Sequence, residues 1–445
     1  MKVSLICPTN YYGESATKGI YYPMGVLLVG SMLKDSFPSW EIDVVDGELY
    51  SIEELKERIR GIDVLGLSAN TNNYPICLGL ASAANEQGAR VVIGGPHATA
   101  LPSQILTNRE FVDAVIVNDG EESFLEFLVG GDLSRVPNLV WRDKEDIRQN
   151  LKIPPAKPPR LIDMNFSLMK LGNYWEEHKK EFPDMDERYV EGFTHVGCNW
   201  RERSDGCRFC DIPYPFNRYQ PPGMFWRDLQ ELRRESGITS FKDYGDCITG
   251  NPERVRALLE ARPSSLDDVE FSCYGRSVEI TEDMADMLKG LNVRYVYIGF
   301  DSGSNKMLRS MRQGYSVKHN YQAAERLESR GINITGSLIL GAEGESEETI
   351  NETETFAREI VQHPNLTQLH CAVLNVFPGS SYGSKMMESF PHLAKDDVWD
   401  VMETQKLWAE RFCNVTQGVL QERASVINNL NPSQRKRYFG LRKLS

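Results

Sequence analysis

Three cysteines in the middle of the chain have the residue type and the spacing to bind metal. Eight residues separate Cys198 from Cys207, and two more separate Cys207 from Cys210. Cysteine thiolates hold iron–sulfur clusters, whereas a structural zinc site is closed by four protein ligands. Three thiols, with no fourth such ligand inside the motif, predict a [4Fe–4S] cluster with one open iron. That iron could chelate a small molecule and pass it an electron, which indicates radical chemistry.

Two other interpretations of these cysteines stay open at this point. A zinc site would need a more distant ligand such as His195, Cys247 or His370. A disulfide framework would need an oxidising compartment. The chain has nine cysteines in 445 residues, and residues 1–8 show neither a basic start nor a long apolar core. Both observations favour a cytoplasmic protein with reduced thiols.

Length and composition narrow the class of protein. The 445 residues predict two or three domains, and 41% hydrophobic and 25% charged residues are typical of a globular protein. The net charge of −13 argues against a nucleic-acid partner bound along its phosphates. No apolar run reaches the 18 or so residues that a membrane span needs, so no membrane contact is expected.

The first 150 residues alternate short apolar runs with amphipathic ones. Strands are predicted at 2–7, 42–45, 64–68, 90–93 and 114–117, with helices between them. This alternation predicts an α/β fold with a doubly wound parallel sheet, which binds ligands beyond the carboxyl ends of its strands. Those ends carry a polar, glycine-rich rim that could approach a ligand closely. The rim contains neither the dinucleotide fingerprint nor a P-loop.

The rim resembles the cobalamin-binding domain that precedes many radical SAM enzymes. The resemblance rests on Tyr22-Pro23-Met24-Gly25, on GGPHATALP at 94–102 and on NDGEESF at 118–124, where the family usually has GEGE. There is no DxHxxG, so the resemblance is to the branch without a histidine below the cobalt. The alternatives are a structural role for His97 at its turn and a sheet that binds nothing. The cobalamin contacts that the resemblance implies are Thr9, Asn10, Met24, Gly25, Ser68, Asn70, Thr71, Gly94, Gly95, Pro96, His97, Gly120 and Glu121.

A second series of strands and helices follows a proline-rich linker at 152–159. Strands are predicted at 193–197, 238–244, 269–274, 294–300, 332–340 and 366–376, with helices between them. Six strands with helical crossovers predict a partial parallel barrel, (β/α)6, whose functional groups lie at the carboxyl ends of its strands. The cysteine loop follows the first of these strands, as that rule expects.

This half resembles the radical SAM superfamily. Its usual motif is CxxxCxxC, and the segment from Cys207 through Phe209 to Cys210 fits the second half of that motif. The first gap is eight residues instead of three, an insertion that we expect to change the path of the loop but not the number of ligands. The resemblance implies contacts to S-adenosylmethionine (SAM) from Phe209, Tyr244, Gly245, Asp246, Ser272, Arg276, Asp301 and Leu340.

Other roles are open for three of these residues. Asp246 and Asp301 could each be a helix N-cap, and Arg276 could pair with an acidic side chain. The segments expected are a cobalamin-binding domain at 1–150, a linker at 151–190, a radical SAM barrel at 191–385 and a helical segment at 386–445. Helices at 396–412 and 417–428 are candidates for a lid over the site.

Together the two resemblances imply a cobalamin-dependent radical SAM enzyme, with a methyltransferase as the first expectation. Reduction of the cluster would cleave SAM to a 5′-deoxyadenosyl radical, which takes hydrogen from an unactivated carbon. The expected partners are a small-molecule or peptide substrate and an external reductant such as flavodoxin or ferredoxin. The alternatives are a cyclase, a rearrangement or oxidation enzyme, transfer of another fragment of SAM, and a non-enzymatic metal protein. The sequence does not identify catalytic residues beyond these cofactor sites.

Overall fold

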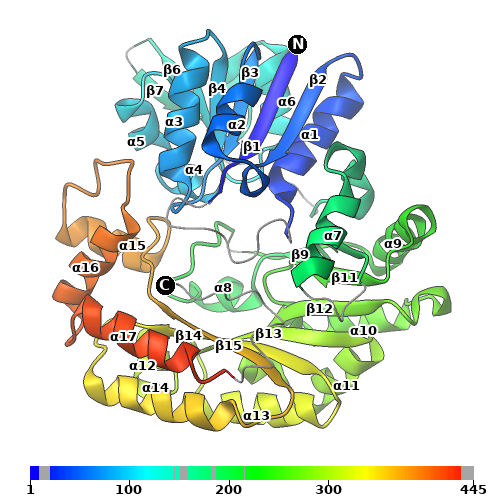
Figure 1. The fold of residues 1–445 in the computed structure, drawn as a ribbon, viewed down its shortest axis with the longest axis vertical. Helices are drawn as coiled ribbons and strands as arrows, with labels where there is room; N and C mark the ends of the chain where they lie inside the picture. Colours follow the sequence, from blue (N-terminus) through cyan, green and yellow to red (C-terminus); the bar gives the residue numbers. More distant parts are fainter. Residues whose placement is uncertain (10–20, 145, 151–157, 182–186, 215, 432–445) are drawn as a thin grey trace. The chain divides into compact units, whose positions relative to one another are not determined.

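The computed structural model describes residues 1–9, 21–144, 146–150, 158–181, 187–214 and 216–431 (Figure 1). The chain forms two compact units, one of Met1–His178 with Phe377–Val401 and one of Lys179–Val376 with Met402–Ser445. Both units are built from parallel sheets and helices, so the predicted α/β fold class is confirmed. Most of the predicted linker at 152–159 lies outside the described residues.

The first unit is built on a seven-stranded sheet in the order β2-β1-β3-β4-β5-β6-β7. Neighbours from β2 to β5 are parallel, while β5, β6 and β7 are antiparallel. The strands are β1 (Lys2–Cys7), β2 (Glu41–Asp46), β3 (Val64–Ser68), β4 (Arg90–Gly94), β5 (Ala114–Ile116), β6 (Leu139–Asp143) and β7 (Asp146–Gln149). The helices are α1 (Met24–Ser36), α2 (Ile52–Arg58), α3 (Tyr74–Asn85), α4 (Pro96–Ala100), α5 (Pro102–Asn108), α6 (Glu121–Val129), α7 (Leu171–Glu181) and α15 (Ser381–Ser389).

The two faces of this sheet are covered by different helices, as a doubly wound fold requires. Side chains of α2, α3 and α5 share one core with Ile6 and Leu67 of the central strands. Helices α1 and α6 pack against each other, and Phe124 of α6 reaches Gly66 of β3. The hairpin of β6 and β7 was not predicted. Strand β7 is largely polar and exposed, which is typical of an edge strand but gives no apolar alternation to read.

The segment 377–401 returns to the first unit although it follows the barrel in the chain. Asp397 is fully buried there and accepts hydrogen bonds from Tyr74 Oη at 2.6 Å and from Arg109 Nε at 2.8 Å. Asn108 Nδ2 also donates to Asp397 at 3.0 Å. These contacts tie the segment to α3 and α5. The helix predicted at 396–412 begins only at Val401, in α16.

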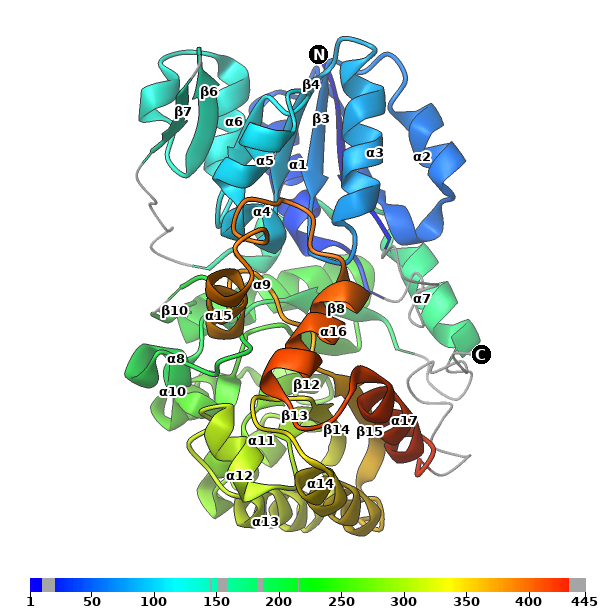
Figure 2. The same cartoon turned by 90° about the vertical axis from the view of Figure 1, so that its left-hand side faces the viewer.

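The second unit contains a six-stranded parallel sheet in the order β15-β14-β13-β12-β11-β8. Its strands are β8 (Tyr189–Gly192), β11 (Ser240–Asp243), β12 (Glu270–Gly275), β13 (Val293–Asp301), β14 (Asn333–Leu340) and β15 (Leu366–Val373). Its helices are α8 (Asn199–Ser204), α9 (Pro222–Ser236), α10 (Pro252–Glu260), α11 (Glu282–Gly290), α12 (Asn305–Ser310), α13 (Val317–Glu328), α14 (Glu347–Ile360), α16 (Val401–Phe412) and α17 (Gln417–Asn428). Figure 2 shows α13 and α14 along one face of this sheet.

The first barrel strand lies earlier than predicted. Strand β8 pairs with β11, whereas the predicted strand at 193–197 leaves the sheet. The segment leaves the sheet because Thr194 donates two hydrogen bonds to the Asp243 carboxylate, one from its backbone N–H at 3.0 Å and one from its hydroxyl. These bonds replace backbone bonds between neighbouring strands. His195–Val196 then form β9, which pairs with β10 (Arg218–Tyr219) in a separate two-stranded sheet.

Two asparagines occupy the open edge of the barrel sheet. Asn428 accepts from Cys371 N at 2.8 Å and donates to Cys371 O at 2.9 Å. Asn431 makes the same pair of bonds with Leu369, at 2.8 and 2.7 Å. The end of α17 thus supplies side-chain amides where a seventh strand would supply backbone ones.

Candidate active site

The eight-residue gap in the cysteine motif is folded into helix α8. Cys198 immediately precedes this helix, and the chain turns back through Asp205 and Gly206, at φ 51° and 74°. Cys207 and Cys210 then form a turn closed by a 3.2 Å bond from Cys210 N to Cys207 O. The insertion therefore changes the path of the loop and leaves all three cysteines at one end of the barrel sheet.

The three thiols suit a cluster that has three protein ligands. Each is partly exposed, and burial, helped by the negative charge of Asp301 and less by Cys210 and Cys198, raises the pKa of Cys207. Burial likewise raises the pKa of Cys210 to about 11. The described residues contain no group of three or more His, Cys, Asp and Glu side chains with metal-binding geometry. The assignment of a cluster to these cysteines therefore rests on their residue type and spacing.

Cys198 differs from the other two thiols. A hydrogen bond from the Cys247 thiol, opposed by burial, lowers the pKa of Cys198 to about 6. Cys247 belongs to the loop after β11 and also contacts Glu279 Oε2 at 3.0 Å. Of the ligands considered for zinc, His195 has both ring nitrogens engaged: Nε2 accepts from Cys247 N at 3.1 Å, and Nδ1 lies 3.1 Å from Thr194 Oγ1. That arrangement favours a structural histidine over a zinc ligand.

The residues after β11 anchor the start of the cysteine loop. Asp246 Oδ2 accepts from Gly197 N at 2.7 Å, one residue before Cys198. Asn251, not Asp246, is the N-cap of α10. A Cβ atom on Gly245 would lie 2.2 Å from the His195 ring, so this position accepts only glycine. Tyr244 extends the inner face of the barrel.

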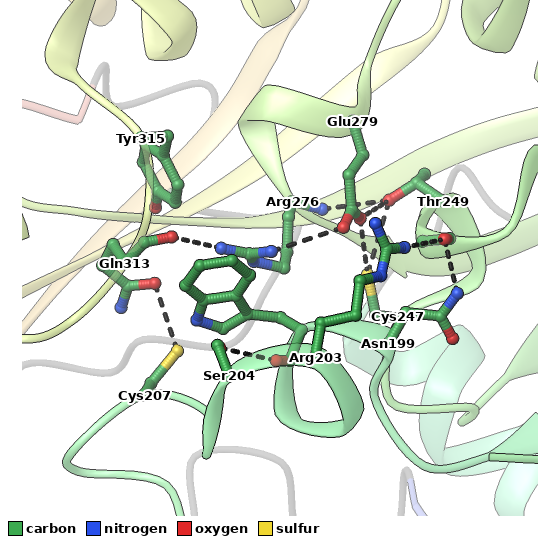
Figure 3. A network of polar contacts seen from close by, with 12 residues as sticks. Asn199, Arg203, Ser204, Cys207, Cys247, Thr249, Arg276, Glu279, Gln313 and Tyr315 are labelled. Carbon is green, nitrogen blue, oxygen red and sulfur yellow. Dashed lines mark hydrogen bonds and ion pairs between the residues drawn. The ribbon is translucent and has the colours of Figure 1, made fainter. Parts of the chain in front are cut away.

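Arg276 lies in a network of polar contacts beside the loop (Figure 3). Its guanidinium bonds Glu279 Oε1 at 3.3 Å and the carbonyl of Gln313, and it lies 4.7 Å from the centroid of the Trp200 ring. The Arg276 and Glu279 side chains are 13% and 16% exposed. Of the two roles considered for Arg276, the structure places it in the ion pair. Burial and tight pairing direct its donors into the protein.

Asp301 is not the N-cap of α12, and its contact with the ribose of SAM stays a prediction. Ser304 is the N-cap of α12, and Asp301 ends β13 in a left-handed conformation with φ 59°. Its carboxylate is buried and shares the Tyr315 hydroxyl, 3.1 Å away, with Gly299 O. Burial raises the pKa of Asp301 to about 6, opposed by Tyr315 and Arg276. A buried carboxylate with a shared donor retains acceptor capacity that a ribose diol could use.

The inner face of the barrel sheet is lined by tyrosines. Tyr244, directly after β11, lies beside Tyr274 of β12, which lies beside Tyr297 of β13, with ring centroids 6.0 and 5.1 Å apart. Tyr274 is 36% exposed although β12 is a central strand, so this face is accessible to a small molecule. Ser272 lies on the same face as Tyr274 because side chains alternate along a strand.

Leu340 and Phe209 both pack against apolar neighbours in the second unit. Leu340 is fully buried and shares the helix-covered face of β14 with Leu338, so its side chain does not line the inner face. Ile339 points the other way and packs with Phe209 against the core of α12. Alternation along the strand turns the Leu340 side chain away from the face that Ile339 occupies, and its contact with SAM stays a prediction.

In the first unit the predicted rim is assembled at the carboxyl ends of β3, β4 and β5. Gly95 has φ 92°, and a Cβ atom there would lie 2.6 Å from Ala69 O, so two rim loops touch through backbone alone. His97 is buried, with Nδ1 3.2 Å from Thr71 Oγ1 and Nε2 2.8 Å from Asp397 O. Both ring nitrogens are thus occupied, as a structural role at the turn requires, and a contact of His97 with cobalamin stays a prediction.

The remaining rim residues differ in exposure. Asn70 is partly buried, and its side chain accepts from Asn72 N and Asn73 N, at 2.9 Å each, within its own loop. Other partly buried residues of the rim are Thr9, Met24, Ser68, Gly94, Gly120 and Glu121. The exposed residues are Gly25 and Pro96. Asn10 lies outside the described residues. This set offers small groups and backbone for a bound cofactor, and no histidine for its metal.

Comparison with known proteins identifies the class. Residues 193–357 match the model of the Radical SAM superfamily, so the second unit carries a radical SAM domain, which takes a [4Fe–4S] cluster and SAM. Residues 15–128 match the model of the B12 binding domain, which takes cobalamin. The chain therefore belongs to the radical SAM enzymes that carry a B12 binding domain. No helix in the described part of the chain is long and apolar enough to cross a membrane.

Individual relatives are similar over most of the chain. The uncharacterized methyltransferase PH0819 of Pyrococcus horikoshii is 24% identical over 81% of this chain and 78% of its own length. The anaerobic magnesium-protoporphyrin IX monomethyl ester cyclase of Cereibacter sphaeroides is 21% identical over 80% of this chain and 60% of its own. The structure of the radical SAM methyltransferase TsrM from Kitasatospora setae, with cobalamin and a [4Fe–4S] cluster bound, has the same fold. Its TM-score is 0.66 at 16% identity, over 87% of this chain and 75% of TsrM.

Some residues of the site were not predicted. Trp200, Glu279, Gln313 and Tyr315 surround Arg276 or the cysteine loop, but none belongs to a short motif. The sequence feature that could have pointed to these residues is Trp200, a tryptophan between two of the proposed metal ligands. Its partners are more than 70 residues away and are set by the tertiary fold.

Proposed function

We propose that the protein is a cobalamin-dependent radical SAM methyltransferase that acts on an unactivated carbon, or on phosphorus, of a small molecule or peptide. The observation that carries this proposal is the presence in one chain of a B12 binding domain and a radical SAM domain. The name of PH0819 and the description of TsrM as a methyltransferase support it. The reductant would be an external one-electron donor such as flavodoxin or ferredoxin.

When bound, the cluster with SAM supplies radical chemistry and cobalamin supplies a methyl group. The chain's own residues would bind and orient these groups. Cys198, Cys207 and Cys210 would hold the iron, and Asp301 would accept hydrogen bonds from the ribose of SAM. The tyrosines around Tyr274 would line the substrate site on the inner face of the barrel. Thr71 and the other rim residues would contact cobalamin.

Anaerobic reconstitution with iron, sulfide and hydroxocobalamin tests the cofactors first. We expect about four irons and about one cobalt per chain after desalting. The loaded protein is then incubated with reductant, a metabolite extract and SAM whose methyl group carries deuterium. A product heavier by that labelled methyl group supports the proposal. Iron without cobalt contradicts the cobalamin-dependent step, and zinc without iron contradicts the cluster.

A ring-forming enzyme is the second candidate, because one relative is a cyclase that matches 80% of this chain. Such an enzyme would use the same cofactor sites but would not transfer the methyl group of SAM. Its product would lose hydrogen and would contain no deuterium from the labelled methyl group. The mass of the product therefore separates the two candidates in the same experiment.

A further inference from the structure

The eight residues between Cys198 and Cys207 include one aromatic side chain with close neighbours in the loop at 311–314. Trp200 is on α8, and its Nε1 donates to Arg312 O at 2.9 Å. Arg276 lies 4.7 Å from the centroid of the ring. Gly314 adjoins the ring, at a distance where a Cβ atom would lie 2.4 Å from Trp200 Cη2. The indole thus has an arginine, a carbonyl and a bare glycine as neighbours.

The loop that holds the indole also contacts the second cysteine and the residue after it. Cys207 Sγ lies 3.2 Å from Gln313 Oε1, and Arg208 N donates to Met311 O at 3.1 Å. Residues 311–314 therefore contact the insertion at Trp200 and the cysteine turn at Cys207. Any shift of the indole relative to this loop would change the spacing between Cys198 and Cys207.

Arg276 itself is fixed from three directions. Glu279 Oε1 lies 3.3 Å from its Nη1, and the Gln313 carbonyl accepts from Nη2. Its backbone N–H donates to Thr249 Oγ1 at 3.1 Å, and that hydroxyl donates to Glu279 Oε2 at 2.9 Å. Figure 3 shows Arg276, Glu279 and Thr249 together in this arrangement. A planar guanidinium held in this way offers a flat surface for stacking, which a lysine does not.

We propose that Trp200 and Arg276 are positioning residues that set the spacing of the three cysteines, with the indole seated against Arg276 and Gly314. In this arrangement the insertion acts as a brace for the cluster loop. The inference rests on the assignment of a cluster to Cys198, Cys207 and Cys210, and it goes beyond the proposed methyl transfer. It also assigns Arg276 to the loop and not to the carboxylate of SAM.

Two substitutions of glycine test the brace with matched backbone strain. Gly314→Ala places a methyl group against the indole, whereas Gly331→Ala has the same positive φ but nothing within 4 Å. After anaerobic reconstitution of the full chain, we expect Gly314→Ala to bind less than half of the iron of the wild type. Gly331→Ala should match the wild type. Equal iron in both variants, with the wild type fully loaded, would overturn the proposal.

Substitutions of the two positioning residues give a spectroscopic test. We expect Trp200→Phe to keep most of the iron and Trp200→Ala to lose more than half. Arg276→Lys and Arg276→Gln should change the electron paramagnetic resonance spectrum of the reduced cluster in the absence of SAM. If Arg276 instead bound SAM, these variants would keep the SAM-free spectrum and iron content and would lose about tenfold or more in SAM affinity. That result would refute the positioning role.

Folding and function are separated by the controls. Circular dichroism and the thermal midpoint of each cluster-free variant show whether that variant is folded. If Trp200→Ala is unfolded, the comparison of iron content between Gly314→Ala and Gly331→Ala tests the proposal. A wild type that binds iron and cobalt but transfers no methyl group contradicts the proposed function and leaves the brace supported by the iron counts. A wild type that takes up no iron overturns the brace together with the cluster.

Discussion

Replacing Asp301 with asparagine is expected to stabilise the cofactor-free protein while it weakens SAM binding. Asp301 is 7% exposed and has φ 59°, a left-handed conformation that asparagine tolerates as well. The amide oxygen can still accept from the Tyr315 hydroxyl, which lies 3.1 Å from Oδ2 in the native protein. The substitution therefore removes a charge with little change in shape.

The size of the gain follows from the raised pKa. Burial raises the pKa of Asp301 from 3.8 to about 6. The folded protein then holds this proton more tightly than the unfolded chain, so stability falls as pH rises between these two values and stays low above them. The raised pKa therefore lowers the free energy of unfolding by about 1.5 kcal/mol at pH 5 and by about 3 kcal/mol at pH 8. Asparagine does not titrate, so the advantage of the variant should grow between those pH values.

Urea unfolding of the cofactor-free chain, followed by circular dichroism at pH 5 and pH 8, measures this difference. Asp205→Asn is the matched control, because Asp205 has φ 51° and a side chain that is 93% exposed. An equal gain at both pH values, or a loss of stability at pH 8, would refute the argument from charge burial. In the reconstituted enzyme, titration calorimetry should show about tenfold weaker SAM binding for Asp301→Asn if the carboxylate holds the ribose.

Two further predictions concern buried contacts. Asp397→Ala leaves the Arg109 side chain without its ion-pair partner. Urea unfolding should show a free energy of unfolding of the first unit that is about 3 kcal/mol lower. Asp396→Ala, at the exposed neighbouring position, is the control and should lower it by less than about 1 kcal/mol. Gly245→Ala places a Cβ atom 2.2 Å from the His195 ring and should lower the thermal midpoint of unfolding by several degrees. Gly25→Ala is the control: a Cβ atom there has nothing within 4 Å, so the thermal midpoint should stay unchanged or rise. Similar effects of the two members of either pair would contradict the packing described.

The positions of most strands along the chain were readable from the sequence because buried parallel strands are short, apolar and separated by helices. Both sheets follow that pattern, and Lys2–Cys7 and Val64–Ser68 have the predicted bounds. The first barrel strand was misplaced because 193–197 is as apolar as Tyr189–Gly192. What separates the two segments is the pair of bonds between Thr194 and Asp243, a contact across 49 residues.

The candidate site was predictable at the level of residue types and less so at the level of partners. The three cysteines and Asp301 could be proposed because their residue types and positions after strands suit metal and ribose. The pairing of Arg276 with Glu279 and Trp200 could not, since an arginine near a strand end suits a ligand carboxylate equally well. His97 is similar, because its partner Asp397 is 300 residues away.

The asparagines at the end of α17 have a consequence for the integrity of the protein outside catalysis. An exposed parallel edge strand is a template on which another chain can add a strand of its own. Asn428 and Asn431 occupy four of the backbone groups of β15 that would recruit such a chain. Cleavage ahead of this helix would free that edge, and the product would then self-associate through backbone pairing. The end of α17 therefore occupies part of an edge at which another chain could otherwise add a strand.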